Sequence, residues 1–251
     1  MIELEQRGNV TIMRLARGKG NALNLELLTA AETSLTEIER SPARAVVVTG
    51  QGSVFGAGVD LAELLDGGEK YLDEFLPRMV RVFSQLATFP KPIVAAVNGH
   101  AIAGGAILML ACDQRLLARG KARIGLTEVL VGVQFPTWAL EIARFATPPE
   151  HFPTLICTGR TYEPEAALAR GLVDELVEPE RLMDRAVEVA AELGAILPAT
   201  FAATKLAVRR PMIEAVRRQE PHEQAILNEW SSPAVLGKIR EFVEKTIKRK
   251  Q

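Results

Sequence analysis

The sequence predicts an α/β fold that ends in a helical C-terminal module. Up to about residue 137, short apolar runs typical of buried strands alternate with helical patterns, and beyond that point the strand signals stop while helical patterns continue. The chain has 251 residues, 48% of them hydrophobic, which is enough to bury a large core. We therefore divide it into a core over residues 1–195 and a helical module over residues 196–251.

The strands are predicted from apolar alternation and from runs of β-branched residues. Alternation over residues 2–15, broken by polar residues around Gly8, predicts a β-hairpin. Short apolar runs that contain several valines are typical of strands buried on both faces. Three further strands are expected, at residues 45–49, 93–97 and 114–118.

The helices are predicted from apolar residues at helical spacing. In the core, helices are expected at residues 24–39, 70–87 and 106–112. Later in the chain they are expected at residues 163–170, 181–193 and 198–217. A last amphipathic helix starts near Ser232, and its apolar stripe of Leu236, Ile239 and Phe242 needs another surface to cover it.

Charge and hydropathy exclude several classes of function. The chain has 30 basic and 31 acidic residues, so it lacks the basic surplus that is typical of nucleic-acid-binding proteins. The N-terminal segment is charged, and the longest apolar stretches are too short to cross a bilayer. We expect a cytoplasmic protein that binds neither nucleic acid nor membrane.

Common nucleotide, nucleophile and metal motifs are absent from the sequence. Gly50 and Gly52 follow a strand, but Phe55 stands where a dinucleotide-binding loop needs its third glycine. Neither a phosphate-binding GxxxxGK[ST] loop nor a GxSxG nucleophile motif is present. The three histidines are scattered without metal-ligand spacing, so no metal site is expected.

Two glycine-rich segments are the most informative parts of the sequence. One covers residues 54–61 (VFGAGVDL), and the other covers residues 96–106 (AVNGHAIAGGA). Glycines at the ends of short strands let the backbone approach a ligand closely. A loop of this kind that enters a helix also presents free N–H groups and the positive end of the helix dipole.

Together with Asn21-Ala22-Leu23-Asn24, these two segments resemble the enoyl-CoA hydratase/isomerase (crotonase) superfamily. The motifs stand in the order and spacing of that family, and the resemblance covers essentially the whole chain. It implies a crotonase-like spiral of ββα units. It also implies that the C-terminal helical module serves trimerisation, so that the protein forms a homotrimer or a dimer of trimers, and that these helices help to complete the CoA site of a neighbouring subunit.

The resemblance also implies a site for an acyl-CoA thioester. The backbone N–H groups of Val59 and Gly104 correspond to the oxyanion hole that stabilises an enolate. The segments that resemble the CoA-binding backbone include Asn21, Ala22, Leu23, Ala57, Asp60 and Leu61. Arg17 and Lys19 either contact the CoA phosphates or lie in a solvated loop. No cofactor is implied, because the CoA is part of the substrate.

The number of carboxylates favours one reaction within the family. Hydratases use two glutamates, and in this sequence Ile107 stands at the first of these positions and Glu128 at the second. Pro136 stands where some relatives carry a catalytic aspartate. The acyl pocket around Glu128 is expected to contain Ile107, Leu126, Phe135 and Trp138. Apolar surroundings of this kind raise the pKa of a carboxyl group and suit it to proton transfer near neutral pH.

A site with one base suits the transfer of a double bond. A single carboxylate can remove a proton from C2 and return it to C4, while the oxyanion hole stabilises the dienolate. The pattern resembles the monofunctional Δ3,Δ2-enoyl-CoA isomerases, from which it departs at Thr127, where those enzymes often carry Asn. We therefore expect an isomerase that converts 3-enoyl-CoA to 2-enoyl-CoA.

Two alternative functions are considered. A hydratase, or another crotonase-type enzyme, would need to recruit a second carboxylate, such as Glu63, Asp66 or Glu141. A subunit that binds acyl-CoA without turning it over is the second alternative. The absence of a carboxylate at Ile107 favours this inactive scaffold, and the presence of Glu128 speaks against it.

Overall fold

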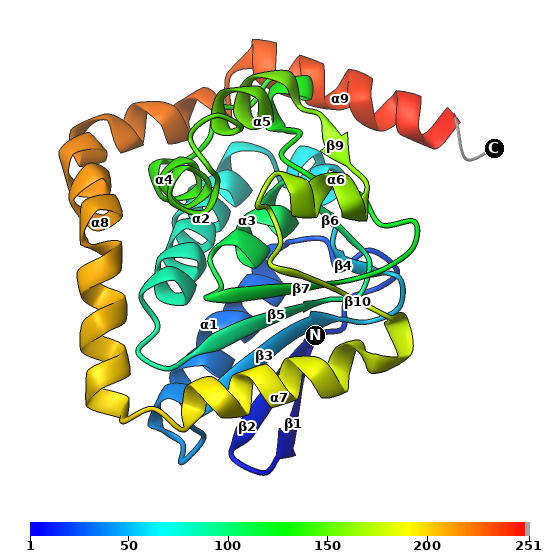
Figure 1. The fold of residues 1–251 in the computed structure, drawn as a ribbon. Helices are drawn as coiled ribbons and strands as arrows, with labels where there is room; N and C mark the ends of the chain where they lie inside the picture. The colour runs from blue at the N-terminus through cyan, green and yellow to red at the C-terminus, as the bar shows by residue number, and fades with distance from the viewer. Residues whose placement is uncertain (249–251) are drawn as a thin grey trace.

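The computed structural model describes residues 1–248, which form two β-sheets enclosed by helices (Figure 1). The large sheet has the order β1-β2-β3-β5-β7-β10 and is parallel except for the β1–β2 hairpin. Its strands are β1 (Ile2–Arg7), β2 (Val10–Leu15), β3 (Ala45–Gly50), β5 (Ile93–Val97), β7 (Gln114–Ala118) and β10 (Glu175–Val177). The small sheet contains β4 (Val54–Gly56), β6 (His100–Ile102), β8 (Ile124–Gly125) and β9 (Thr161–Tyr162), in that order.

The helices cover both faces of the large sheet and the end of the small one (Figure 1). In the core they are α1 (Leu25–Arg40), α2 (Leu61–Thr88), α3 (Gly104–Leu110), α4 (Thr137–Ala146), α5 (Phe152–Thr158), α6 (Pro164–Ala169) and α7 (Leu182–Gly194). Two short 3-10 turns, η1 (Glu128–Leu130) and η2 (Pro179–Arg181), lie between them. The chain ends with α8 (Pro198–Glu229) and α9 (Pro233–Lys248).

The chain repeats a strand–strand–helix unit. After the N-terminal hairpin and α1, the order is β3-β4-α2, then β5-β6-α3, then β7-β8 followed by η1 and α4. In these later units the first strand joins the large sheet and the second joins the small sheet. Each turn therefore advances both sheets by one strand, which confirms the predicted α/β spiral of ββα units.

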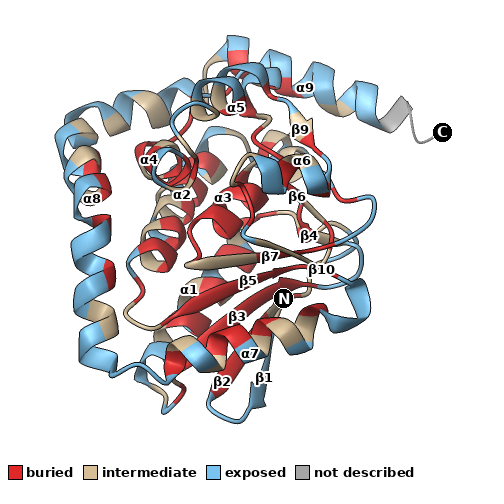
Figure 2. Cartoon of the chain, viewed as in Figure 1, coloured by how far each residue is buried: buried red, intermediate tan, exposed pale blue. Residues whose placement is uncertain are grey.

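The central strands β3 and β5 of the large sheet are buried on both faces, whereas the edge strand β1 is mostly exposed (Figure 2). In β3, Val46 and Val48 belong to the main core with α1 and α2, whereas Ala45 and Val47 pack with residues of α7. Successive side chains of a strand point to opposite faces, so a strand covered on both sides must be apolar throughout. This requirement explains why β3 and β5 read as continuous apolar runs.

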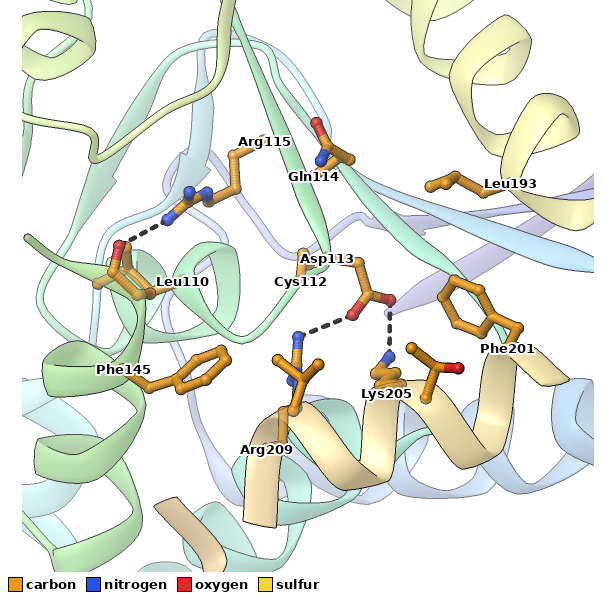
Figure 3. Close-up of a pocket in the computed structure, with 13 residues that line it drawn as sticks. Leu110, Cys112, Asp113, Gln114, Arg115, Phe145, Leu193, Phe201, Lys205 and Arg209 are labelled. Atoms are coloured by element: carbon orange, nitrogen blue, oxygen red, sulfur yellow. Dashed lines mark hydrogen bonds and ion pairs between the residues drawn. The ribbon is translucent and has the colours of Figure 1, made fainter. Parts of the chain in front are cut away.

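Asp113 fastens α8 to the body of the molecule. Asp113 follows α3 in the chain. Its carboxylate accepts hydrogen bonds from Lys205 at 2.7 Å and Arg209 at 2.8 Å, both on α8 (Figure 3). It also accepts the backbone N–H of Ile93 at 2.9 Å. Both cationic side chains are buried, so Asp113 compensates charges that are largely removed from water.

Beyond this anchor, α8 turns across the end of the molecule and leads into α9 (Figure 1). Two prolines, Pro211 and Pro221, lie inside α8, and each removes a helical hydrogen-bond donor, a common cause of bending. The division into residues 1–195 and 196–251 stays a prediction, and the last three residues of the second part lie outside the described residues.

Several boundaries differ from the sequence-based expectations. Helix α2 begins at Leu61, not near residue 70, because a first helical segment precedes a break at Gly68 (φ 61°, ψ −153°). Helix α8 continues to Glu229, beyond the expected end at residue 217. The expectation that strands stop near residue 137 was wrong, since β9 and β10 follow. These strands have two and three residues, too few to produce a periodic signal.

Within residues 1–248, no single helix is both long and apolar enough to cross a membrane. Residues Pro179–Gly194 and Pro198–Glu229 meet that criterion only as a pair, which is bent by 100°.

Candidate active site

The small sheet brings three loops to one edge. Strands β4, β6 and β8 are parallel neighbours, with Val54 opposite His100 and Ala101 opposite Ile124. Parallel strands end at the same edge of a sheet, where ligands commonly bind in α/β proteins. Val59, Gly104 and Glu128 follow these strands by only two or three residues. Segments far apart in the sequence thus meet at one place.

Glycines allow the first two loops to pack backbone against backbone. A Cβ atom on Gly105 would lie 2.1 Å from the carbonyl oxygen of Gly56, a distance that no side chain tolerates. At Gly58 the φ angle is +84°, and a Cβ atom there would lie 2.8 Å from that of Ala103. Any residue with a side chain at these positions would push the two loops apart.

The geometry of the first loop leaves the N–H of Val59 available. Leu23 donates its N–H to Gly58 at 2.7 Å and accepts the N–H of Asp60 at 2.9 Å. In such a parallel bridge the residue between the two partners points its own N–H away from the neighbouring strand. Among residues 1–248, no protein acceptor receives the N–H of Val59.

The second loop presents Gly104 at the start of α3. The preceding residue, Ala103, has φ 52° and ψ −129°, an unusual conformation for a residue with a side chain. Its N–H donates to the carbonyl oxygen of Gly125 at 2.9 Å, which ties this loop to β8. Gly104 then occupies the first turn of the helix, where backbone N–H groups have no helical partner.

Both loops line one cavity of about 120 Å³. Glu128 lies in its wall, and the rest of the lining is mainly apolar. Within the part of the chain that the structure describes, no other acidic side chain and no Lys or Arg lines this cavity. One carboxyl group therefore lies beside two loops with unpaired N–H groups.

Burial sets the protonation behaviour of Glu128. The residue is only 8% exposed, and no hydrogen-bond partner within residues 1–248 reaches its Oε2 atom. Loss of solvation raises the pKa of Glu128 to about 8, against a smaller lowering by the backbone N–H groups of Thr127 and Glu128 itself. Near neutral pH this group can therefore both accept and return a proton.

Of the four residues expected in the acyl pocket, Ile107 lines the cavity. It is fully buried there, on α3. Leu126 and Phe135 are buried but are not among the residues that line it. Trp138 lines a separate cavity beside α8, because its neighbour Ala139 faces the active-site cavity and successive helical residues point about 100° apart.

The segment around Asn21 runs beside the first glycine loop. Asn21 is buried, has φ 47°, and donates its side-chain amide to the carbonyl oxygens of Gln51 and Val54. The N–H of Ala57 donates to the carbonyl oxygen of Gly20 at 3.0 Å. Of the six residues expected to bind CoA, only Ala57 and Leu61 line the cavity. Leu23 pairs with this loop through backbone hydrogen bonds to Gly58 and Asp60, whereas the carbonyl oxygen of Ala22 accepts a hydrogen bond from the Arg17 side chain.

The guanidinium group of Arg17 binds two carboxylates. It donates to Asp60 at 2.8 Å and to Glu63 at 2.9 Å. Asp60 also caps α2 by accepting the N–H of Glu63 at 3.1 Å. Asp60 therefore holds the loop that carries Val59. Lys19, which precedes this segment in the chain, lies exposed.

The alternative carboxylates lie elsewhere. Glu63 is held by Arg17 and Asn24, and Asp66 is exposed. Glu141 is buried and accepts hydrogen bonds from Gln219 and Arg144. None of the three lines the cavity that contains Glu128.

Four of the lining residues that the sequence did not identify as part of the site have large side chains and come from the long helices. Met79 and Phe83 come from α2, Trp230 from the end of α8, and Phe242 from α9. The four-residue spacing of the first pair marks one face of a helix, and Phe242 belongs to the expected apolar stripe. Neither pattern says which cavity such a face covers, since this depends on how α8 and α9 fold back.

Comparison with known proteins gives the family. The model of the enoyl-CoA hydratase/isomerase family matches residues 5–249. Over 212 residues the chain is 36% identical to a putative enoyl-CoA hydratase of Thermus thermophilus, covering 82% of each protein. Over 254 residues it is 28% identical to the mitochondrial enoyl-CoA delta isomerase 1 of Mus musculus, covering all of this chain and 88% of that protein.

A solved structure supports the same assignment. The crystal structure of human mitochondrial delta3-delta2-enoyl-CoA isomerase matches with a TM-score of 0.94 at 25% identity, covering 100% of this chain and 99% of that one. This match confirms the crotonase-like fold expected from the three motifs. The chain belongs to the enoyl-CoA hydratase/isomerase family.

Proposed function

We propose that this protein shifts the double bond of a 3-enoyl-CoA to the 2-position, with Glu128 as its single acid/base residue. The observation that carries the proposal is a cavity with one carboxyl group, which belongs to Glu128, beside the unpaired N–H groups of Val59 and Gly104. The rest of the lining, including Ile107, neither accepts nor donates a proton readily.

The reaction assigns one task to each group. The Glu128 carboxylate removes a proton from C2, and the electrons move onto the thioester oxygen to give a dienolate. The N–H groups of Val59 and Gly104 donate hydrogen bonds to that oxygen, and each such donor typically contributes roughly 3–4 kcal/mol to the stabilisation of the transition state. The protonated Glu128 then returns the proton to C4, which leaves the double bond between C2 and C3.

Ile107 is the feature that favours isomerisation over hydration. Addition of water needs a group that holds and activates the water while a second group delivers a proton. Ile107 is fully buried and apolar, and it stands where the family resemblance places the first hydratase glutamate. The same reasoning speaks against a recruited partner, because Glu63, Asp66 and Glu141 do not line the cavity.

Two mitochondrial isomerases are similar to this chain over its whole length. The mouse and human mitochondrial isomerases align with the whole chain, including α8 and α9, whereas the Thermus putative hydratase aligns with 82% of it. The C-terminal helices supply Trp230 and Phe242 to the cavity. Similarity to the isomerases therefore includes the part of the chain that closes this site.

The same proposal includes the CoA moiety and the assembly. The segment of Asn21, Ala22 and Leu23, together with Ala57, Asp60 and Leu61, would hold CoA through backbone groups beside the cavity mouth. We further propose a cytoplasmic homotrimer, or a dimer of trimers, on the resemblance to the family. Gel filtration with light scattering would test the assembly, and a monomer would contradict it.

The test measures two reactions with one protein. Purified protein is given a 3-enoyl-CoA and, separately, crotonyl-CoA, while formation of 2-enoyl-CoA and hydration are followed. We expect isomerisation without appreciable hydration, and we expect Glu128→Gln to abolish it. Asp66→Asn makes the same carboxylate-to-amide change at an exposed position and is expected to leave the rate unchanged.

Each other outcome selects another function. Hydration of crotonyl-CoA that is lost in Glu128→Gln would indicate a hydratase with a second acid/base group, and it would mean that the apolar Ile107 does not prevent hydration. Binding of acyl-CoA without either reaction would favour the inactive scaffold or another acyl-CoA reaction.

A further inference from the structure

We propose that Trp230 is the stop that limits the length of the acyl chain admitted to this cavity. The inference rests on the proposed function, because it takes the ligand to be an acyl-CoA whose thioester oxygen binds Val59 and Gly104. The acid/base role of Glu128 does not determine which acyl chain lengths the protein prefers. That preference is the property assigned to Trp230, at the end of α8.

Exposure of the lining residues separates a mouth from a floor. The exposed lining residues include Ala57 and Phe242, which is 40% exposed, and we assign them to the mouth. The buried lining residues include Met79 and Trp230, each 2% exposed, and the fully buried Ile107, and we assign them to the floor. An acyl chain must enter from the exposed side, and its apolar tail gains most where water is excluded.

The position of the thioester fixes the direction of the chain. Its oxygen is bound by Val59 and Gly104, and the side chain of Phe83 lies close to Gly104, with Cζ 3.7 Å from the place where a Cβ atom would stand. Phe83 therefore lies beside the reacting end of the chain. Trp230 is not among the nearest neighbours of Gly104, and its indole N–H donates to the carbonyl oxygen of Gln134, in the loop after η1, at 3.0 Å.

Trp230 has the properties of a fixed stop. It is the largest side chain in the floor, and the hydrogen bond to Gln134 holds its ring in one orientation. Its backbone N–H donates to Leu227 at 3.2 Å, so the residue also ends α8 in a defined way. Met79, its neighbour in the floor, has a flexible thioether side chain that yields to a ligand more easily.

Phe242 provides a matched control. It is also aromatic, also comes from the C-terminal helices and also lines the cavity, but it lies at the exposed mouth on α9. A change there alters entry of every substrate in the same way. A change at Trp230 alters the depth of the cavity and so discriminates among substrates by length.

The experiment measures kcat/KM for a homologous series of 3-enoyl-CoA substrates of increasing length with the full chain. We expect Trp230→Ala to move the preferred substrate to longer chains. Each additional methylene accommodated in an apolar pocket should change the ratio of long-chain to short-chain kcat/KM by about tenfold or more. Trp230→Phe keeps a ring at this position and should retain most of the original preference. Phe242→Ala should change KM for all lengths alike.

An unchanged length optimum in Trp230→Ala would overturn the proposal, as would an equal shift in Phe242→Ala. Trp230→Leu, a smaller perturbation of the end of α8, repeats the test if the alanine variant does not fold. Titration with saturated acyl-CoAs of the same lengths separates this proposal from the proposed function. Trp230→Ala could change which acyl-CoA length binds best while the wild-type protein turns over no 3-enoyl-CoA. That result would support the role of Trp230 in limiting chain length and would refute the proposed isomerase function. Absence of acyl-CoA binding in the wild-type protein would refute both.

Discussion

Asp113 and Glu128 are two acidic side chains that the fold largely removes from water, and their surroundings are opposite. Asp113 meets two cations, Lys205 and Arg209, as well as the backbone N–H of Ile93. Glu128 has apolar neighbours, and no partner within residues 1–248 reaches its Oε2 atom. The first arrangement holds a helix in place, whereas the second leaves a carboxyl group whose charged form is unfavourable.

The difference supports the role proposed for Glu128. A carboxylate that is held by two cations already uses its hydrogen-bonding capacity within the protein. Removal of such a carboxylate leaves the buried cations without a counter-charge. A carboxyl group without a partner is ready to exchange a proton with a ligand. Four measurements test whether this contrast holds.

The largest effect is expected for Glu128→Gln on the rate of isomerisation. Removal of a positioned acid/base group typically lowers the rate roughly 10²- to 10⁴-fold, and no second carboxyl group from residues 1–248 lines the cavity to replace it. Steady-state kinetics with a 3-enoyl-CoA measures the loss, with circular dichroism to check the fold. A variant that keeps more than a tenth of the rate would place the base elsewhere.

The next effect concerns stability at Asp113. Asp113→Ala leaves Lys205 and Arg209 buried without their counter-charge, which typically lowers the free energy of unfolding by about 3–5 kcal/mol. Urea denaturation followed by fluorescence measures the change. Glu165→Ala removes an exposed partner of Arg119 and should lower stability by less than about 1 kcal/mol. Equal effects of the two variants would mean that the Asp113 cluster does not anchor α8.

A smaller effect is expected on the free energy of unfolding as pH changes, because of the ionisation of Glu128. The pKa of Glu128 rises from an ordinary value of 4.5 to about 8 on folding, so the folded state retains a proton that the unfolded state has lost between these pH values. The contribution of Glu128 to stability is therefore fully present below about pH 4.5, and it is lost as pH rises toward about 8.

Glu128→Gln should remove that part of the pH dependence. The variant should then be more stable than the wild-type protein above pH 8, although it is inactive. Urea denaturation of both proteins across this range makes the comparison. Parallel curves for the two proteins would show that burial does not perturb Glu128.

The smallest effect is on the pH dependence of the rate. Removal of the C2 proton requires ionised Glu128, so kcat/KM should rise with pH and level off above an apparent pKa near 8. This predicts an increase of about tenfold between pH 7 and pH 9, because the ionised fraction changes by that factor. A rate that is constant over this range would indicate a pKa well below 7.

The sequence predicted the parts of this site that follow short strands. Val59, Gly104 and Glu128 all stand within three residues of a strand end, where local motifs and the parallel arrangement determine position. Ile107 follows from the same motif, since it lies one helical turn after Gly104 on α3. Local sequence is sufficient there because the backbone itself forms the site.

The far side of the cavity could not be predicted in this way. Trp138 was expected in the acyl pocket, yet Trp230 lines it, and both are apolar aromatic residues on helices. The choice between them depends on the rotation of α4 and on the path of α8 after its anchor at Asp113. Such long-range packing leaves no periodic signal in either segment, and the same holds for the short strands β9 and β10.

The order of the cavity residues along the chain has a consequence for biosynthesis. Val59, Gly104 and Glu128 emerge from the ribosome before Trp230 and Phe242, which line the same cavity. A nascent chain that has not yet completed α8 lacks these two side chains, which help to shield Glu128 from water. The burial that raises the pKa of Glu128 is therefore complete only after α8 and α9 have been made.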